Sequence, residues 1–352
     1  MKKFLSMQLV LVLILSLFTG CGNSTSETTA ATEDVGTDES TTESADITTA
    51  SADTVSVMAL KGPTAMGMVK LMNDADSNVL TSYDYNFSIA ASVDEVTPAL
   101  VQGNTDIAAV PANVASVLYN NTKGNVEVLA INTLGILYIV ENGDSVQSVS
   151  DLKGKTIYAS GKGATPEYAL NYILQQNGIN PETDVTIEWK SEHTECLAAL
   201  IEAEGGIALL PQPFVATAQT KMPSLRVALD LTHEWDSLQA DDTTASALIT
   251  GVVVARKDFI EQNPDAVIDF LTQYKASVDY VNSNVSDAAT LVGNYGIVDA
   301  AVAEKAIPAC NITYIDGAEM KTKLSGYLNT LLEQNPESIG GALPDDDFYF
   351  QQ

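Results

Sequence analysis

The chain has 352 residues, of which 46 are acidic and 17 are basic, and its formal net charge is −29. A chain of this length is longer than a domain with a single hydrophobic core usually is, which predicts two lobes. The charge excludes nucleic acid as a partner, because its phosphates would be repelled, and only Arg226 and Arg256 could clamp an anion with a guanidinium group.

The first 53 residues are predicted to lie outside the folded part. Two lysines precede an apolar run at 4–18, which is typical of a secretory signal peptide covering 1–20. The small residues that follow lead to Cys21, as in a lipobox, so we expect Cys21 to be acylated and anchored to the membrane. An ordinary signal peptide cut nearby is the alternative. Residues 21–53 carry eight acidic and no basic or aromatic side chains, which predicts a disordered tether.

From residue 54 onward, apolar runs of strand length alternate with helical patterns, which favours a parallel α/β sheet. This pattern occurs twice. The letters KGPT at 61–64 and KGAT at 162–165 each follow a predicted strand, 101 residues apart. Residues 99–111 align with 199–211 without a gap. Two copies of one α/β unit explain these matches better than chance similarity between common βα segments.

Each repeated motif is predicted to stand at the carboxyl end of a strand, where open α/β sheets bind ligands. Gly62 and Gly163 permit close approach of the backbone, and Pro63 suits a first helical turn. Thr64 and Thr165 can cap a helix or donate a hydroxyl group. Two lobes that face each other across these loops would enclose a small ligand.

The second unit resembles ABC-importer binding proteins for nitrate, sulfonates, taurine and thiamin-precursor pyrimidines. The most specific stretches are DLKGKTI at 151–157, GKGATPEY at 161–168 and NGIN at 177–180. The segment GGIALLPQPF at 205–214 departs from the family, because Gly206 and Gln212 stand where acidic residues are common.

This resemblance implies a two-lobed type II periplasmic-binding fold, in which each lobe is a mostly parallel sheet flanked by helices. The chain would start in lobe one, cross to lobe two and return through a two-strand hinge, with crossings near 135–141 and 248–256. We expect lobe one at 54–137 and 250–335, lobe two at 138–249, and a C-terminal tail of unassigned role at 336–352.

Carried onto this sequence, the resemblance also predicts the ligand-binding residues. Tyr168 and Phe214 would stack on a planar ligand, although simple packing explains either ring equally well. Lys61 and Lys162 could hold an anion or be solvated. The predicted ligand-binding set is Gly62, Pro63, Thr64, Ala65, Pro111, Ala112, Asn113, Gly163, Ala164, Thr165, Tyr168, Gln212, Pro213 and Phe214.

Motifs for catalysis or metal binding are lacking in the sequence. His193 and His233 are the only histidines, and neither falls in a predicted ligand loop or in a zinc-site spacing. No phosphate-binding P-loop and no nucleophile elbow is present. Cys196 and Cys310 either pair or remain free thiols. We therefore expect no catalytic residue, metal or cofactor, and a neutral, aromatic or monoanionic solute.

Together these features predict an extracytoplasmic, lipid-anchored and monomeric substrate-binding protein of an ABC importer. Its partners would be a small solute, the membrane permease with its ATPase, and the lipid bilayer through the acyl anchor. Two alternatives stay open. One is an enzyme like the pyrimidine-precursor synthases built on this fold, and the other is a ligand-sensing receptor lipoprotein.

Overall fold

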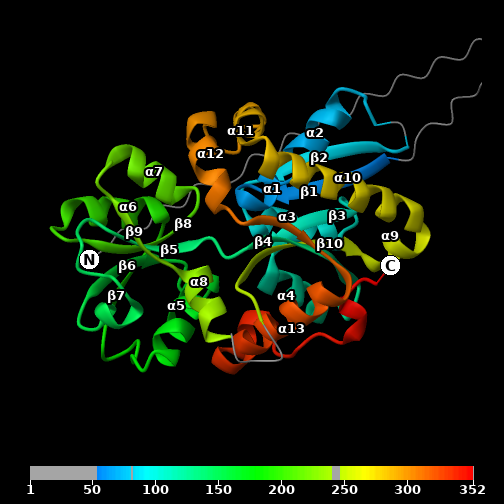
Figure 1. Ribbon diagram of the computed structural model, residues 1–352. Coiled ribbons are helices and arrows are strands. Elements are labelled where there is room, and N and C mark those ends of the chain that lie inside the picture. Colours follow the sequence, from blue (N-terminus) through cyan, green and yellow to red (C-terminus); the bar gives the residue numbers. More distant parts are fainter. Residues whose placement is uncertain (1–53, 81, 240–245, 352) are drawn as a thin grey trace, which may run out of the picture. The chain divides into compact units, whose positions relative to one another are not determined.

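The computed structural model describes residues 54–80, 82–239 and 246–351, which form two mixed β-sheets flanked by helices (Figure 1). The predicted signal peptide, Cys21 and the tether lie outside these residues. The first sheet has the order β11-β4-β10-β3-β1-β2. Its strands are β1 (Thr54–Leu60), β2 (Asp84–Ala90), β3 (Ile107–Pro111), β4 (Val126–Leu134), β10 (Ile249–Arg256) and β11 (Ile312–Ile315).

The second sheet has the order β7-β6-β8-β5-β9. Strand β6 pairs in parallel with β7 and β8, whereas β5 runs antiparallel to β8 and β9. The strands are β5 (Leu137–Glu141), β6 (Thr156–Ser160), β7 (Thr186–Lys190), β8 (Ile207–Pro211) and β9 (Arg226–Asp230).

The repeat predicted from the sequence appears as one strand order used twice. In the first sheet β2, β1 and β3 are followed by β4, with β10 inserted antiparallel between β3 and β4. In the second sheet β7, β6 and β8 are followed by β9, with β5 inserted in the same way. The inserted strands make both sheets mixed, because each enters from the opposite direction after the chain crosses between the sheets.

The helices of the two units follow their strands as the repeat requires. Pro63 opens the first helix after Gly62, whose φ of 131° lies in the region that favours glycine. In the first unit the helices are α1 (Pro63–Met66), α2 (Val69–Asp76), α3 (Val93–Val101) and α4 (Ala112–Thr122). In the second they are α5 (Thr165–Gln176), α6 (His193–Glu202), α7 (Phe214–Lys221) and α8 (Leu231–Leu238).

The remaining helices return to the first sheet. The longest of them, α10, begins at Pro264 and buries Phe270 and Tyr274 against the core, while Ile268 faces outward. These helices are α9 (Lys257–Gln262), α10 (Pro264–Ser283), α11 (Val285–Asn294), α12 (Ala300–Ala306) and α13 (Gly317–Gln334). Short 3-10 turns occur at Val149–Leu152, Ile307–Ala309, Pro336–Ile339 and Asp346–Phe348.

The C-terminal tail packs back onto the first sheet. Phe348 is fully buried, and its ring lies 5.2 Å from that of Tyr119 in an edge-on contact. Tyr349 forms an isolated parallel bridge with Val128 of β4, next to the short strand β11. The tail therefore lies along the edge of β4 beyond the end of β11. It covers a part of the sheet edge that would otherwise be open.

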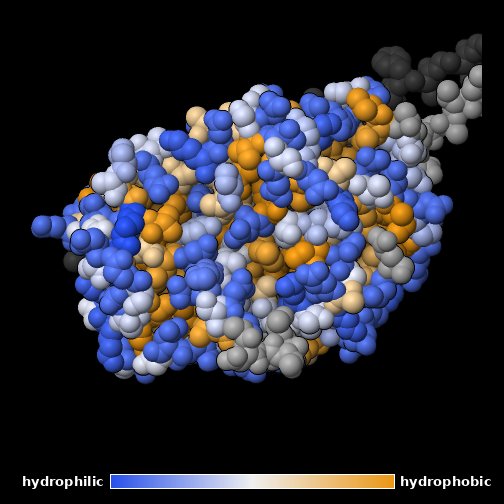
Figure 2. All heavy atoms as spheres, viewed as in Figure 1, coloured by the Kyte–Doolittle hydropathy of each residue, from blue (hydrophilic) through white to orange (hydrophobic). Residues whose placement is uncertain are grey.

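The chain passes between the sheets at Gly135 and Ile136 and again before β10. The two strands at these crossings belong to different sheets, since β5 pairs with β8 and β9 and β10 pairs with β3 and β4. Hydrophilic side chains cover most of the face shown in Figure 2, with hydrophobic ones between them. Within the described ranges, no helix is both long and apolar enough to cross a membrane.

Candidate functional site

A cavity of about 730 Å³ is lined by strand ends from both sheets. Leu60 and Pro111 end β1 and β3 of the first sheet, while Leu137 begins β5 and Pro211 ends β8 of the second. We call this space the central cavity, and its volume is typical of small-molecule sites, which span about 300–1,000 Å³. Apolar side chains and short polar ones line it together.

Ten of the fourteen residues predicted to bind a ligand line this cavity. They come from loops of both units, which lie up to 152 residues apart between Gly62 and Phe214. Strand ends that are distant in the sequence are therefore brought to one place, as the repeat predicts. The ten are Gly62, Pro63, Thr64, Pro111, Asn113, Ala164, Thr165, Gln212, Pro213 and Phe214.

Four predicted residues lie elsewhere. Ala65 and Ala112 are buried beneath their helices, because each points from the first turn toward the sheet. Gly163 and Tyr168 line a separate surface depression, and the Tyr168 hydroxyl donates to the Gly163 carbonyl at 3.0 Å. Asn335 donates in turn to the Tyr168 hydroxyl at 3.0 Å. Tyr168 therefore links α5 to the end of α13 and does not line the central cavity.

The cavity receives the first turns of several helices. The helices α4, α5, α6 and α7 each contribute a residue from their amino-terminal turn, including Asn113, Thr165, His193 and Thr217. Backbone N–H groups in such turns lack partners within the helix, and the helix dipole is positive there. The arrangement therefore favours a ligand with hydrogen-bond acceptors or negative charge.

His193 is the main cavity-lining residue that the sequence analysis did not select. It is the first residue of α6 and lines the cavity, although it lies outside the ligand loops predicted from the sequence. Its counterpart in the first unit, Val93, begins α3 and lines the cavity as well. The repeat could have shown both, because they follow the strand ends of β2 and β7 at an offset of 100 residues.

Other lining residues come from segments outside the repeated motifs. Ile297 and Val298 follow α11, and Thr250 lies at the start of β10. The Thr250 hydroxyl has no hydrogen-bond partner within the described part of the chain and is buried. A buried hydroxyl without a partner is costly, so Thr250 is suited to hydrogen-bond a ligand.

The two predicted threonines play different structural roles, and neither caps its helix with its side chain. Thr64 donates its hydroxyl to the Leu60 carbonyl at 2.6 Å. Thr165 accepts a hydrogen bond from the Tyr327 hydroxyl at 3.2 Å. Both hydroxyl oxygens keep further hydrogen-bonding capacity toward the cavity.

Within the described part of the chain, Lys61 is the one lysine or arginine that lines the central cavity. Its repeat counterpart Lys162 lies outside, on a surface depression beside β7. Arg256 pairs with Asp106 and Asp258, each at 3.2 Å. The cavity therefore offers a single permanent positive charge.

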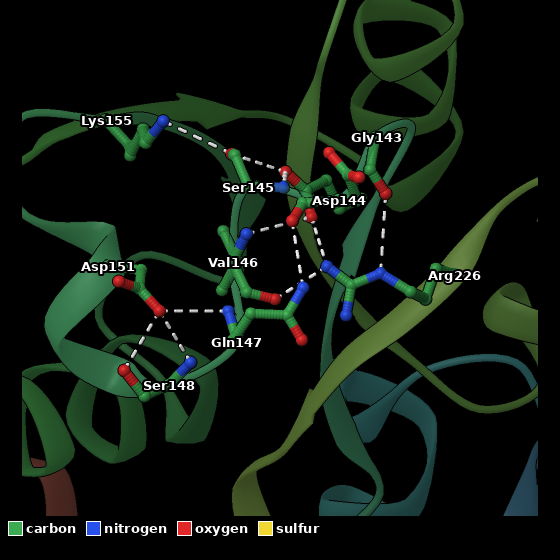
Figure 3. Close-up of polar contacts among 10 residues, drawn as sticks. Gly143, Asp144, Ser145, Val146, Gln147, Ser148, Asp151, Lys155 and Arg226 are labelled. Atoms are coloured by element: carbon green, nitrogen blue, oxygen red, sulfur yellow. Dashed lines mark hydrogen bonds and ion pairs between the residues drawn. The ribbon is translucent and has the colours of Figure 1, made fainter.

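Arg226 forms an ion pair with the buried carboxylate of Glu141, at the other end of β5 from the cavity. Burial alone would raise the pKa of Glu141, but hydrogen bonds from Ser145 and Val146 and the Arg226 guanidinium hold that pKa below its ordinary value. Figure 3 shows Arg226 donating to the backbone carbonyls of Gly143 and Val146. Arg226 therefore has a structural role in the fold.

Cys196 and Cys310, whose pairing the sequence left open, are both buried and free. Cys310 lies 4.0 Å from the Met66 sulfur, among core residues of the first sheet. Among the described residues, no group of three or more His, Cys, Asp or Glu side chains is arranged to hold a metal ion.

Comparison with protein families agrees with this geometry. The family model described as "ABC transporter, phosphonate, periplasmic substrate-binding protein" matches residues 70–301. The chain belongs to this family. The expectation of an ABC-importer substrate-binding protein is therefore confirmed, and so is an extracytoplasmic location in the general sense that the family name implies. Comparison with curated proteins gave no match.

Solved structures similar to this substrate-binding protein confirm the fold. An ABC transporter protein from Parabacteroides distasonis has 24% sequence identity and a TM-score of 0.71, covering 85% of this chain and 99% of its own. The aliphatic sulphonate binding protein of Escherichia coli has 15% identity and a TM-score of 0.65, with coverage of 84% and 96%. The alkanesulfonate-binding protein of Xanthomonas axonopodis pv. citri, bound to MOPS, has 13% identity and a TM-score of 0.58, with coverage of 84% and 96%.

Proposed function

We propose that this substrate-binding protein captures a small organic monoanion with an apolar body, of which an alkanesulfonate is the best-fitting class. The single observation that carries the proposal is the charge content of the central cavity. Lys61 provides one permanent positive charge, and both arginines are engaged elsewhere. A dianion would remain partly uncompensated in such a site, which is costly when the charge is taken out of water.

The rest of the lining supports the same ligand class. Threonine hydroxyls and helix amino-terminal turns suit three acceptor oxygens, whereas Phe214, Ile136 and Leu137 suit an apolar body. The solved relatives whose names mention sulfonates share the fold and are consistent with this assignment.

The proposed transport step is closure of two lobes on the ligand. Lobe one comprises 54–137 and 250–335, and lobe two comprises 138–249. The cavity lining comes from both ranges, so a bound ligand bridges them. Ligand binding then shifts the population toward the closed form by its differential affinity for that form. The closed form is delivered to the permease, which works with its ATPase.

Isothermal titration with matched ligands tests this proposal. At a pH above the second pKa of ethylphosphonate, where this ligand is a dianion, we expect ethanesulfonate to bind more tightly than ethylphosphonate, and diethyl sulfone to bind weakly. Lys61→Met should weaken ethanesulfonate binding about tenfold, near the low end for a charge-assisted hydrogen bond because Lys61 is exposed. Lys162→Met is the matched control and should bind normally. Failure of every small solute to bind, or equal losses in the two variants, would refute the proposal.

We also propose that the protein is a monomer tethered by a lipid on Cys21. The motif around Cys21 and the acidic composition of 21–53 support this arrangement. In the producing bacterium, Cys21→Ser should move the protein from the membrane fraction to the soluble fraction. Acylation would add the mass of the lipid to the wild type only. If the intact masses of the two proteins after signal removal differ only by the substitution itself, acylation is ruled out.

His193 in the cavity gives a reason to examine the enzymatic alternative. A synthase of the pyrimidine-precursor type that consumes its own side chain would lose protein mass during turnover. For a binding protein, we expect unchanged intact mass and unchanged ligand after prolonged incubation. A mass loss that His193→Asn abolishes would instead establish the enzyme.

A further inference from the structure

His193 is held in a fixed position in the wall of the central cavity. Its Nδ1 lies 2.5 Å from the Ser160 Oγ at the end of β6. The ring packs beside Phe214, with centroids 4.8 Å apart and planes inclined by 50°. With Nδ1 engaged, Nε2 is the ring nitrogen left to contact a ligand, and it has no hydrogen-bond partner within the described ranges.

The surroundings of His193 favour its neutral form in the free protein. Burial lowers its pKa, and the neighbouring carboxylate of Glu192 opposes this effect only partly. The amino-terminal end of α6 is itself positive, which further disfavours a cation at the first residue of the helix. An anion placed in the cavity would reverse this balance.

The other charged groups near this end of α6 offer His193 little compensation. Glu195 of α6 accepts a hydrogen bond from the Ser191 backbone. On β7, Lys190 pairs with Glu188 at 2.9 Å. Behind Ser160, burial raises the pKa of Cys196, so this thiol stays neutral. The facing loop of the first unit adds Lys61, which is positive.

We propose that His193 contacts the anionic group of the ligand and takes up a proton when the ligand binds, so that the protein captures its solute more tightly in acid. The inference rests on the proposed function, because it requires a monoanion in the central cavity. In acid, protonated His193 and Lys61 would then share the anion; above the higher pKa His193 stays neutral, and the cavity keeps the single charge of Lys61 that favours a monoanion. Loss of the ligand would return His193 to its neutral form.

The direction of the pH dependence follows from proton linkage. A bound anion raises the pKa of His193 above its value in the free protein, so the complex binds more protons than the free protein between these two values. Affinity is therefore constant above the higher pKa and constant again below the lower pKa. Between the two values, the affinity increases by up to about tenfold for each unit by which the pH is lowered. An alkanesulfonate is the right probe, since its own charge does not change in this range.

The test is isothermal titration of the full chain with ethanesulfonate from about pH 5 to about pH 8, where an ordinary histidine titrates. Two buffers with different ionisation enthalpies report the protons taken up. We expect the affinity to rise at least about fivefold toward acid with net proton uptake. His193→Asn should bind with a flat pH profile and no uptake. His233→Asn is the matched control, because His233 is exposed on α8 outside the cavity, and it should behave like the wild type.

A second measurement does not depend on the folding of a variant at position 193. The chain has two histidines, so the NMR signals of their imidazole rings are assigned by comparison with His233→Asn. We expect saturating ethanesulfonate to raise the pKa of the His193 signal and leave the chemical shift of the His233 signal unchanged at a fixed pH. Binding with a pH-independent affinity, or an unshifted His193 signal, overturns the inference alone. No binding at any pH overturns the proposed function together with the inference.

Discussion

Tyr327 of α13 donates its hydroxyl to Thr165 of α5 at 3.2 Å, and this bond ties a helix that packs on the first sheet to the wall of the central cavity. The Tyr327 ring also lies 5.8 Å from that of Trp235 on α8. Both large side chains are fully buried. Helices α8 and α13 therefore share an apolar contact next to Thr165, which lines the cavity.

Removing this hydroxyl should weaken ligand capture with little loss of packing. We expect Tyr327→Phe to lower the ethanesulfonate affinity about two- to tenfold, which corresponds to the net 0.5–1.5 kcal/mol of a neutral hydrogen bond. Tyr295→Phe is the control, because its hydroxyl bonds to Asp76 away from the cavity. Equal affinities of the wild type and Tyr327→Phe, measured by titration calorimetry, would show that the bond does not stabilise the bound form.

The pair of Glu141 and Arg226 should stabilise the fold in a pH-dependent manner. The pKa of Glu141 is lowered in the folded protein, so its contribution is present above its unfolded pKa and is lost as the pH falls through its folded pKa. We expect Arg226→Met to cost about 1–3 kcal/mol near pH 7, below the 3–5 kcal/mol of a fully buried pair because Arg226 is 32% exposed. Urea unfolding should show a smaller cost near pH 4.

A surface ion pair provides the control for that experiment. Lys321 pairs with Asp346, which is 91% exposed, so Lys321→Met should change the free energy of unfolding by less than about 1 kcal/mol. A loss in Arg226→Met that is the same at both pH values would contradict the assigned role of Glu141.

The C-terminal tail should be an integral part of the first sheet. Phe348 is fully buried, and its truncation leaves a cavity beside Tyr119. We expect Phe348→Ala to lower the free energy of unfolding by about 3–5 kcal/mol, as for other buried phenylalanines. Leu343→Ala, at a side chain that is 40% exposed, should cost less than about 0.5 kcal/mol. Similar denaturation midpoints for the two variants would mean that the tail does not pack as described.

The two folded cysteines should be inaccessible thiols. Burial raises the pKa of Cys310 to about 12 and also raises that of Cys196, so little reactive thiolate is present at neutral pH. In a Cys21→Ser chain, we expect no rapid reaction with an aromatic disulfide reagent in the native state and two reactive thiols in denaturant without reductant. Finding none in denaturant would indicate a disulfide instead.

The sequence by itself determined the repeated α/β units, and together with the family resemblance it predicted ten of the residues that line the cavity. These features are local, because a glycine, proline or threonine directly after an apolar run indicates where the strand ends and the ligand-facing loop begins. The offset of about 100 residues even contained the positions of Val93 and His193, although their role is visible only once both helices begin at the same cavity.

Tertiary structure decided what each side chain does there. Tyr168 follows a ligand loop in sequence, yet it accepts hydrogen bonds from Gln334 and Asn335 at the end of α13. Ile297 and Val298 reach the cavity from a connection with no repeat motif. Both arginines form ion pairs with carboxylates more than 80 residues away in the sequence: Arg226 pairs with Glu141, and Arg256 pairs with Asp106. Such contacts form between segments that are far apart in the sequence. The spacing of residues within one segment does not specify which distant segment will pack against it.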